Sequence, residues 1–279
     1  MPEVNEVSIT AQYIAKKILG KKITDFKVLS GRYTHQKLNG LELLKYPLKI
    51  KNIDTKGKFL WFELLDHNDK TIYLMNTFGL TGSWSFEEDD NSRIMIEIDK
   101  KKYLYYDDPR NFGTFNFTDD EKVFNKKLNS LGPDLLKEEF TYSDLKKRFK
   151  SVKQNIPIIK ILMDQTKKGI GSGIGNYLAP EILYNAKISP HRTAESLSSN
   201  DIKKIYNSIK YIIKLSYMDN NYFDLKFKGK KNFIPDVDVS NKKFNFNVYM
   251  QKTDPLGNTV KKDSIINDRT TYWVPNVQK

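Results

Sequence analysis

The 279-residue sequence contains no cysteine and only three histidines, His35, His67 and His191, which lie far apart. The missing cysteines exclude disulfides, thiol catalysis and zinc sites built on thiolates. The sequence also has no apolar run long enough to span a bilayer, and its N-terminus carries no basic-plus-apolar signal peptide. We therefore expect a soluble intracellular protein.

Acidic residues are the minority, with 34 Asp and Glu against 47 Lys and Arg, which gives a net charge of +13. Clustered cations favour a polyanionic partner because they release counterions from phosphate backbones, so nucleic acid is the leading candidate and an anionic membrane surface the second. The many Lys, Asn and Ile residues also fit an AT-rich genome, in which case the charge is a solvated surface. At roughly 150 residues per domain, the length predicts about two domains.

The first half of the chain predicts one helix followed by strands. Residues 7–19 have apolar side chains at helical spacing, and Gly20 follows as a C-cap. Between residues 22 and 117, short apolar runs alternate with turn signals, which is typical of a β-sandwich. The expected strands are KITDFKVLS, KFLWFELL, TIYLMNTF, RIMIEI, KYLYY and GTFNF, and the acidic stretches 87–90 and 119–121 are expected loops.

The second half predicts helices and then a hairpin. A Gly-Pro break marks residues 129–142 as a linker. Helical spacing follows, and from about residue 242 the pattern returns to strands with a turn at 255–258. The expected helices are 143–150, 156–165, 177–186 and 200–218. The fold class is thus α+β, divided into an N-terminal domain (1–128), the linker (129–142), a helical domain (143–241) and a terminal hairpin (242–279).

The N-terminus, Met1-Pro2-Glu3, carries a possible nucleophile. If Met1 is removed, Pro2 exposes a secondary amine with the pKa of ~8 typical of α-amino groups. The unprotonated fraction can attack a sugar C1′ carbon and leave an iminium, with the adjacent Glu3 as general acid to the ring oxygen. A proline at position 2 also fits an ordinary chain start.

Three loops offer further candidate residues. Asp108–Gly113 fits a turn, or a loop that enters a duplex with Arg110 and Phe112. Phe78–Gly82 presents Leu80 either as a buried leucine between glycines or as an apolar wedge between base steps. The glycine-rich stretch up to Asn176 precedes a helix whose N–H groups suit a phosphate, and it lacks the Gly-Lys-Ser/Thr ending of a nucleotide-binding P-loop.

Taken in order, these motifs resemble those of the formamidopyrimidine-DNA glycosylase and endonuclease VIII family over nearly the whole chain. The matching segments are Met1-Pro2-Glu3 with Glu6, Gly57-Lys58, Phe78–Gly82, Asp108-Pro109-Arg110 with Phe112-Gly113, Leu131-Gly132-Pro133, Gly173–Asn176 and Arg269–Tyr272. The resemblance implies a β-sandwich domain and a helix–two-turn–helix domain, with DNA held in the cleft between them.

The resemblance also implies a role for each matched residue. Pro2 is the expected nucleophile, Glu3 the general acid/base, and Glu6 lies near the extruded nucleotide. Phosphates flanking that nucleotide would be held by Lys58, which we group with the catalytic residues, and by Asn176 and Arg269. The vacated stack would be filled by Leu80, Arg110 and Phe112.

The sequence departs from the family at its C-terminus, where many members carry a four-cysteine zinc finger. Val274 and Val277 occupy two thiolate positions, and the first pair is missing around 254–258. We expect no metal and no cofactor, and a hairpin that resembles the zincless finger of animal and viral endonuclease VIII-like enzymes. The apolar contacts expected to replace the metal come from Val248, Tyr249, Ile265, Ile266, Tyr272, Trp273 and Val274.

Two further departures concern DNA contacts and base recognition. Asn111 stands where many relatives have a second arginine, which weakens one expected backbone contact. Residues 219–238, where some relatives have a base-recognition loop, are rich in Lys, Asn and Phe and do not align.

The expected function is that of a bifunctional DNA glycosylase and AP lyase of base excision repair. It would remove oxidised pyrimidines and hydantoins and cleave the strand by β,δ-elimination through a Schiff base on Pro2. Its partner would be double-stranded DNA, with single strands left open; we expect a monomer without membrane contact, in the nucleus or, if viral, in a viral factory. Two alternatives remain: a non-catalytic DNA-binding protein that retains the clamp, and an RNA- or ribosome-associated protein.

Overall fold

The computed structural model describes residues 2–221, 237–240, 242–267 and 269–279, which form two compact units. The first unit comprises Pro2 and Glu6–Asn129, and the second comprises Glu3–Asn5 and Ser130–Lys279. No helix in the described part of the chain has the length and apolar character needed to cross a bilayer.

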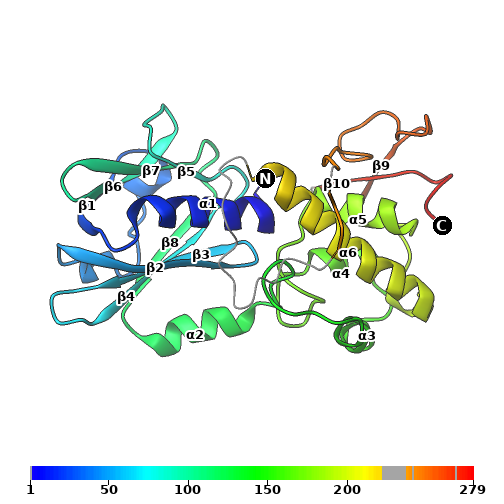
Figure 1. Cartoon of the computed structure of the whole chain (residues 1–279), viewed down its shortest axis with the longest axis horizontal. Coiled ribbons are helices and arrows are strands. Elements are labelled where there is room, and N and C mark those ends of the chain that lie inside the picture. Colours follow the sequence, from blue (N-terminus) through cyan, green and yellow to red (C-terminus); the bar gives the residue numbers. More distant parts are fainter. Residues whose placement is uncertain (1, 222–236, 241, 268) are drawn as a thin grey trace. The chain divides into compact units, whose positions relative to one another are not determined.

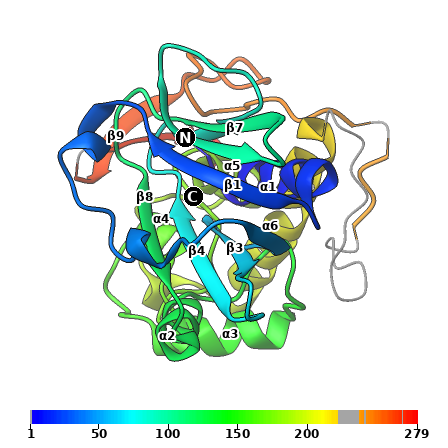
Figure 2. The same ribbon diagram turned by 90° about the vertical axis from the view of Figure 1, so that its left-hand side faces the viewer.

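The first unit is an antiparallel β-sandwich with one helix packed against its core (Figures 1 and 2). The strand order is β5-β7-β6-β1-β2-β3-β4-β8, and β1 and β2 pair only through Lys22–Lys49 and Ile23–Leu48. The sheet folds over at this short pairing, so that β1, β6 and β7 form one layer and β2, β3 and β4 the other. The strands are β1 (Lys22–Val28), β2 (Leu48–Lys56), β3 (Phe59–Leu65), β4 (Thr71–Thr77), β5 (Ser83–Ser85), β6 (Ser92–Ile98), β7 (Lys102–Asp107) and β8 (Thr114–Thr118).

The core of this unit follows from the two side-chain periodicities of the sequence. In β6 every second residue is buried, which turns Ile94, Ile96 and Ile98 towards the opposite layer. Helix α1 (Val4–Ile18) buries Val7, Ala11, Ile14 and Ile18 in the same core, because residues three or four apart share one helix face. The predicted N-terminal helix is thereby confirmed.

Three elements of the first unit were not predicted: β2, β5 and helix α2 (Glu121–Ser130). β2 carries a bulge between Ile50 and Asn52, which breaks the alternation that marks a strand. The stretch 119–121 was expected to be a loop throughout, but Glu121 is the first residue of α2. The buried Phe124 of α2 stacks on Tyr73 with ring centroids 4.0 Å apart, so a tertiary contact stabilises this short polar helix.

The second unit contains the four predicted helices, α3 (Tyr142–Ser151), α4 (Ile158–Met163), α5 (Leu178–Ala186) and α6 (Ser199–Asn220). Capping boxes begin two of them: Thr141 with Asp144 for α3, and Ser198 with Asp201 for α6. The short 3₁₀ helices are η1 (Gly31–Thr34) and η2 (Leu41–Leu43) in the first unit and η3 (Ala194–Ser196) in the second.

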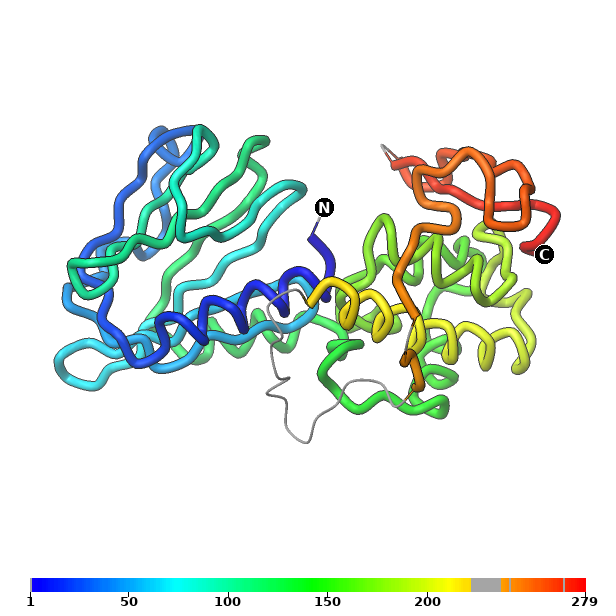
Figure 3. Tube along the Cα trace, turned by 45° about the horizontal axis from the view of Figure 1, so that its top comes forward, coloured from blue at the N-terminus to red at the C-terminus, as the bar shows by residue number. Residues whose placement is uncertain are grey.

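The C-terminal part of the second unit contains the hairpin of β9 (Lys261–Ile266) and β10 (Arg269–Trp273), which packs on α4 and α5 (Figure 3). The turn at 255–258 is confirmed: it is closed by pairing of Thr253 with Thr259, and Gly257 has a φ of 83°. The expected strand from residue 242 is wrong, since the described residues from 242 to 250 are irregular. Within this segment, the backbone N–H groups of residues 247–249 bind the side chain of Glu181 instead of a neighbouring strand.

Candidate active site

Glu3, directly after Pro2, is held at the N-terminus of α5. Pro2 is half-buried and Glu3 is fully buried. The Glu3 carboxylate accepts hydrogen bonds from the backbone N–H groups of Gly175 at 2.5 Å, Tyr177 at 2.8 Å and Leu178 at 3.3 Å. A helix N-terminus stabilises negative charge through these unsatisfied N–H groups, so Glu3 occupies an anion site made by the chain itself.

The glycine-rich turn before α5 is shaped by close backbone approach. Gly173 has a φ of +119°, and a Cβ there would lie 2.5 Å from the Cβ of Val4. The side chain of Gln165 spans the turn: its Oε1 accepts from the Gly173 N–H at 2.8 Å and its Nε2 donates to the Ile174 carbonyl at 2.7 Å. Asn176 is half-buried in this turn, between two residues whose N–H groups bind Glu3. The fold thus brings two predicted site residues, Glu3 and Asn176, together.

Gln165 is a positioning residue to which sequence reasoning assigned no role. The one clue in the sequence was the position of Gln165, directly after Asp164 and before the glycine-rich turn. No pattern of residues there shows whether the side-chain amide of Gln165 spans the turn or faces solvent.

In the first unit, the buried carboxylate of Asp108 joins the two predicted DNA-contacting loops. It accepts from the Tyr33 hydroxyl at 2.8 Å, the Thr81 hydroxyl at 3.0 Å and the Gly113 N–H at 2.7 Å. Thr81 also accepts from the Arg110 N–H at 3.3 Å. Burial, reinforced by Asp108, raises the pKa of Tyr33 far above its usual range, so its hydroxyl remains a donor.

Leu80, Arg110 and Phe112 therefore lie on adjoining loops of the first unit. Phe112 is 49% exposed and its ring lies 5.2 Å from the Arg110 guanidinium, a cation–π contact. Leu80 is half-buried, so it is not the fully enclosed leucine that a purely structural role would produce. Gly79, with a φ of +63°, permits the loops to meet, because a Cβ there would lie 2.5 Å from the Phe112 carbonyl carbon.

Lys58 and Glu6 also belong to the first unit. Lys58 is half-buried in the two-residue turn between β2 and β3, where Gly57 has a φ of +58°. Glu6 is half-buried in the first turn of α1. Both residues have interaction partners in the structure, and their functional roles stay predictions.

Arg269 is exposed at the first residue of β10, and a small cluster holds the hairpin that carries it. Val248, Val260 and Val274 are buried together, with Tyr184, Tyr272 and Val277 packed against them. Val274 and Val277, at the expected thiolate positions, thus contribute apolar contacts. Four other residues that were expected to replace the metal are only half-buried and lie outside this cluster: Tyr249, Ile265, Ile266 and Trp273.

Polar side chains, which the sequence prediction missed, provide the rest of the anchoring. Asp254 is buried and accepts from the N–H groups of Leu256 at 3.0 Å and Asn258 at 2.7 Å, and from the Tyr184 hydroxyl at 3.0 Å. Burial, reinforced by Asp254, raises the pKa of Tyr184 to about 12, so Tyr184 stays a donor. Near the chain end, buried Gln278 accepts from Val274 N–H at 2.7 Å and donates to the Ile188 carbonyl at 3.0 Å.

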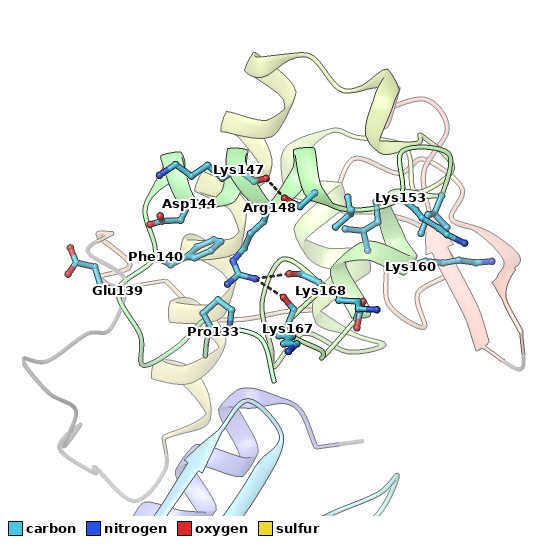
Figure 4. A pocket seen from close by; sticks show the side chains of 16 residues that line it. Pro133, Glu139, Phe140, Asp144, Lys147, Arg148, Lys153, Lys160, Lys167 and Lys168 are labelled. Atoms are coloured by element: carbon cyan, nitrogen blue, oxygen red, sulfur yellow. Dashed lines mark hydrogen bonds between the residues drawn. The ribbon is translucent and has the colours of Figure 1, made fainter. Parts of the chain in front are cut away.

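A basic hollow in the second unit is lined by other residues (Figure 4). It has a volume of about 860 Å³ between α3, α4 and the loop after α4, and Lys147, Lys153, Lys160, Lys167 and Lys168 surround it. Arg148 donates to the carbonyls of Lys167 at 3.3 Å and Gly169 at 2.9 Å, which holds the loop against α3. None of the predicted site residues lines this hollow.

Two sequence expectations concern metals and base recognition. Among the residues that the structure describes, no group of three or more His, Asp or Glu side chains is arranged to hold a metal ion. The expected base-recognition segment, 219–238, lies for the most part outside the described residues, which omit 222–236.

Comparison with known proteins matches both units. Models of three domains of formamidopyrimidine-DNA glycosylase match this chain: the N-terminal domain at residues 1–115, the H2TH domain at 131–222 and the C-terminal domain at 235–279. Formamidopyrimidine-DNA glycosylase from Corynebacterium glutamicum is 27% identical and covers 100% of this chain and 99% of its own length. The Prochlorococcus marinus protein of the same name is 29% identical over 100% of both chains.

Solved structures show the same fold. The MutM (Fpg) protein of Thermus thermophilus has a TM-score of 0.77 at 23% identity, covering 99% of this chain and 98% of its own. A mutant Lactococcus lactis Fpg in complex with DNA containing Fapy-dG has a TM-score of 0.78 at 21% identity and 100% coverage of both chains.

The β-sandwich, the H2TH helices and the ordered motifs define a DNA glycosylase of base excision repair. More particularly, the chain belongs to the formamidopyrimidine-DNA glycosylase family. The recognition made from the sequence motifs is confirmed at this level.

Proposed function

We propose that this protein is a bifunctional DNA glycosylase and AP lyase whose nucleophile is the amine of Pro2. The observation that carries the proposal is the burial of Glu3 under three backbone N–H groups. We infer that this carboxylate, which belongs to the residue next to the N-terminal amine, moves protons for that amine.

The first step proposed is displacement of the damaged base. After removal of Met1, the lone pair of the Pro2 nitrogen attacks C1′ of the extruded nucleotide, and the base leaves with the electron pair of the glycosidic bond. The proton lost by the Pro2 nitrogen passes to Glu3, which starts as a carboxylate. Glu3 then delivers it to the ring oxygen O4′ as the C1′–O4′ bond breaks, which leaves a cationic iminium between Pro2 and C1′ whose nitrogen carries no proton.

The lyase steps follow because the iminium makes the C2′–H bond of the sugar acidic. Loss of a C2′ proton expels the 3′ phosphate, and loss of the C4′ proton then expels the 5′ phosphate. Water hydrolyses the iminium to free the amine and the sugar fragment. The DNA is left with a one-nucleotide gap bounded by phosphates.

The proposed partner is DNA that contains a damaged base or an abasic site. Its support is the net charge of +13, and structural relatives of this fold have been solved with DNA that contains Fapy-dG or 8-oxo-G. In this proposal Lys58, Asn176 and Arg269 bind phosphates beside the extruded nucleotide. Leu80, Arg110 and Phe112 occupy the stack that it vacates, and Glu6 lies near the nucleotide itself.

The substrate class we propose is oxidised pyrimidines and hydantoins, as in endonuclease VIII-like enzymes with a zincless finger. Its support is a hairpin without cysteine that Asp254, Gln278 and an apolar cluster hold, together with a half-buried leucine, Leu80, on the loop 78–82. The bacterial relatives described above are named formamidopyrimidine-DNA glycosylase and not endonuclease VIII. Single-turnover excision of dihydrouracil and of 8-oxoguanine from otherwise identical duplexes decides between the two preferences.

Three further expectations accompany this proposal and stay predictions. They are the division into 1–128, 129–142, 143–241 and 242–279, the monomeric state, and action in the nucleus or in a viral factory.

Borohydride trapping on a duplex that contains dihydrouracil tests the chemistry. The wild type is compared with Pro2→Gly and with a form that retains Met1. We expect a covalent protein–DNA adduct from the wild type that is lost or reduced in both controls. If folded protein free of Met1 gives no adduct, the non-catalytic DNA-binding alternative replaces this proposal.

A further inference from the structure

A hollow of about 320 Å³ on the first unit is lined only by aromatic and lysine side chains. It contains none of the residues assigned above to base excision. The six lining residues are Tyr13, Lys17, Phe86, Lys101, Lys102 and Tyr103.

The fold assembles this lining from three separate segments. Tyr13 and Lys17 are one turn apart on α1, Phe86 follows β5, and Lys101–Tyr103 lie where the turn after β6 enters β7. The Tyr13 and Phe86 rings meet edge to face at 5.8 Å, and the Lys17 ammonium lies 5.6 Å from the Tyr13 ring centroid. These contacts hold an aromatic wall beside the lysines.

The lining side chains remain accessible to a ligand. Lys17, Lys101 and Lys102 are exposed, and Tyr103 is 41% exposed. Exposed tyrosine is a surface on which a planar ring can stack, and three ammonium groups within one hollow attract successive negative charges. Lys100 precedes this group and extends the positive charge along the turn.

We propose that this hollow is a second nucleic-acid site, which binds a single-stranded polynucleotide. Unpaired bases expose the flat faces that stack on aromatic side chains, whereas a duplex keeps those faces stacked inside the helix. Lysines then bind the phosphates that connect the stacked bases. The site thereby holds an undamaged single strand, and it acts independently of the chemistry proposed for Pro2.

Fluorescence anisotropy with labelled twelve-residue oligo(dT) and oligo(U) tests the site, with three variants. Tyr103→Ala removes a stacking surface worth ~1–3 kcal/mol per base, so we expect affinity to fall by about 5- to 150-fold. Tyr103→Phe keeps the ring and retains affinity. Lys101→Ala/Lys102→Ala lowers the slope of log K against log[salt] by about 1.4, at ~0.7 for each single-strand phosphate contact.

The control is Lys122→Ala/Lys126→Ala, which removes two exposed lysines from α2 in the same unit. We expect it to leave binding of both oligonucleotides nearly unchanged. Loss of oligo(dT) binding, oligo(U) binding or both in the test variants supports the site and shows which sugar it accepts.

Unchanged affinity for both oligonucleotides in Tyr103→Ala overturns the inference, as does an equal loss in the test and control lysine pairs. Excision from a short dihydrouracil duplex is measured in parallel. If Tyr103→Ala weakens excision as much as it weakens single-strand binding, the hollow belongs to the lesion interface and the second site does not exist.

Discussion

Glu181 on α5 accepts a hydrogen bond from the backbone N–H of Val248, 67 residues away in sequence, at 2.9 Å. The same fully buried carboxylate also binds the backbone N–H groups of Asn247 at 3.0 Å and Tyr249 at 2.9 Å. One side chain thus attaches the irregular segment before the C-terminal hairpin to a helix of the same unit. Prediction from sequence gave Glu181 no role.

Glu181→Gln should detach this segment. In glutamine, an NH₂ donor replaces one of the two acceptor oxygens. Backbone N–H groups that bound this oxygen would then be buried without an acceptor. We expect a loss of about 1.5–3 kcal/mol in the free energy of unfolding, the range for one hydrogen bond to a charged group. Urea unfolding and amide hydrogen exchange at 247–249 measure the effect, and the exposed Glu195→Gln is the control; equal stability of the two variants would contradict the assignment.

Gly79→Ala should destabilise the fold more than replacement of another glycine with a positive φ. An alanine at φ +63° is strained by ~1–2 kcal/mol, and its Cβ would lie 2.5 Å from the Phe112 carbonyl carbon. The matched control is Gly257→Ala, where φ is +83° but nothing lies within 4 Å of the added Cβ. We expect thermal unfolding to show a clearly larger loss for Gly79→Ala; equal losses would mean that the two loops separate without cost.

Arg269→Ala should lower excision of the base more than cleavage at a preformed abasic site, if Arg269 helps to hold an extruded nucleotide. Loss of a charge-assisted phosphate contact, at ~1.5–3 kcal/mol, predicts about a 10- to 100-fold decrease in single-turnover excision. Lys261→Ala, on the paired strand β9, controls for loss of charge on the hairpin. Equal decreases in the two reactions would remove this role from Arg269.

Metal chelators should leave activity intact. The hairpin is held by Asp254, Gln278 and the Val248–Val260–Val274 cluster. Prolonged treatment with a strong zinc chelator, followed by the excision and trapping assays, tests this. Inhibition that added zinc reverses would show that the anchoring of the hairpin has been misread.

The hairpin should loosen in acid through Asp263. Partial burial raises the pKa of this carboxyl, but hydrogen bonds from His191 at 2.8 Å and Trp273 at 2.6 Å outweigh burial and lower it below its usual value. Because the pKa is lower in the folded state, the ionised carboxylate stabilises the fold at pH values above the unfolded-state pKa of ~3.9. This stabilisation is lost as the pH falls through the folded-state pKa. The Trp273 indole N–H resonance, followed from pH 6 down to about pH 3, should therefore shift below about pH 4.

Asp263→Asn is the control for this titration. It cannot ionise, so its Trp273 resonance should lack the transition. A transition of the same size in the variant would assign the acid sensitivity to another carboxyl group.

Much of the secondary structure could be predicted because its cause is local. The alternation in β6 and the apolar face of α1 record which side of each element is buried. β2, β5 and α2 escaped prediction because a bulge, a length of three residues and one ring stack on Tyr73 determine them. None of these three features produces a periodic pattern of apolar residues in the sequence.

The sequence by itself determined the absence of a thiolate metal site, the order of the family motifs and the candidate residues Pro2, Glu3, Asn176 and Arg269. Only the tertiary structure decided which N–H and O–H donors the buried carboxylates bind. Glu3 meets Gly175 across 172 positions, and Asp108 meets Tyr33 across 75. Neither pairing is encoded in local spacing, because a buried carboxylate accepts from whichever N–H or O–H groups the packed fold brings within reach.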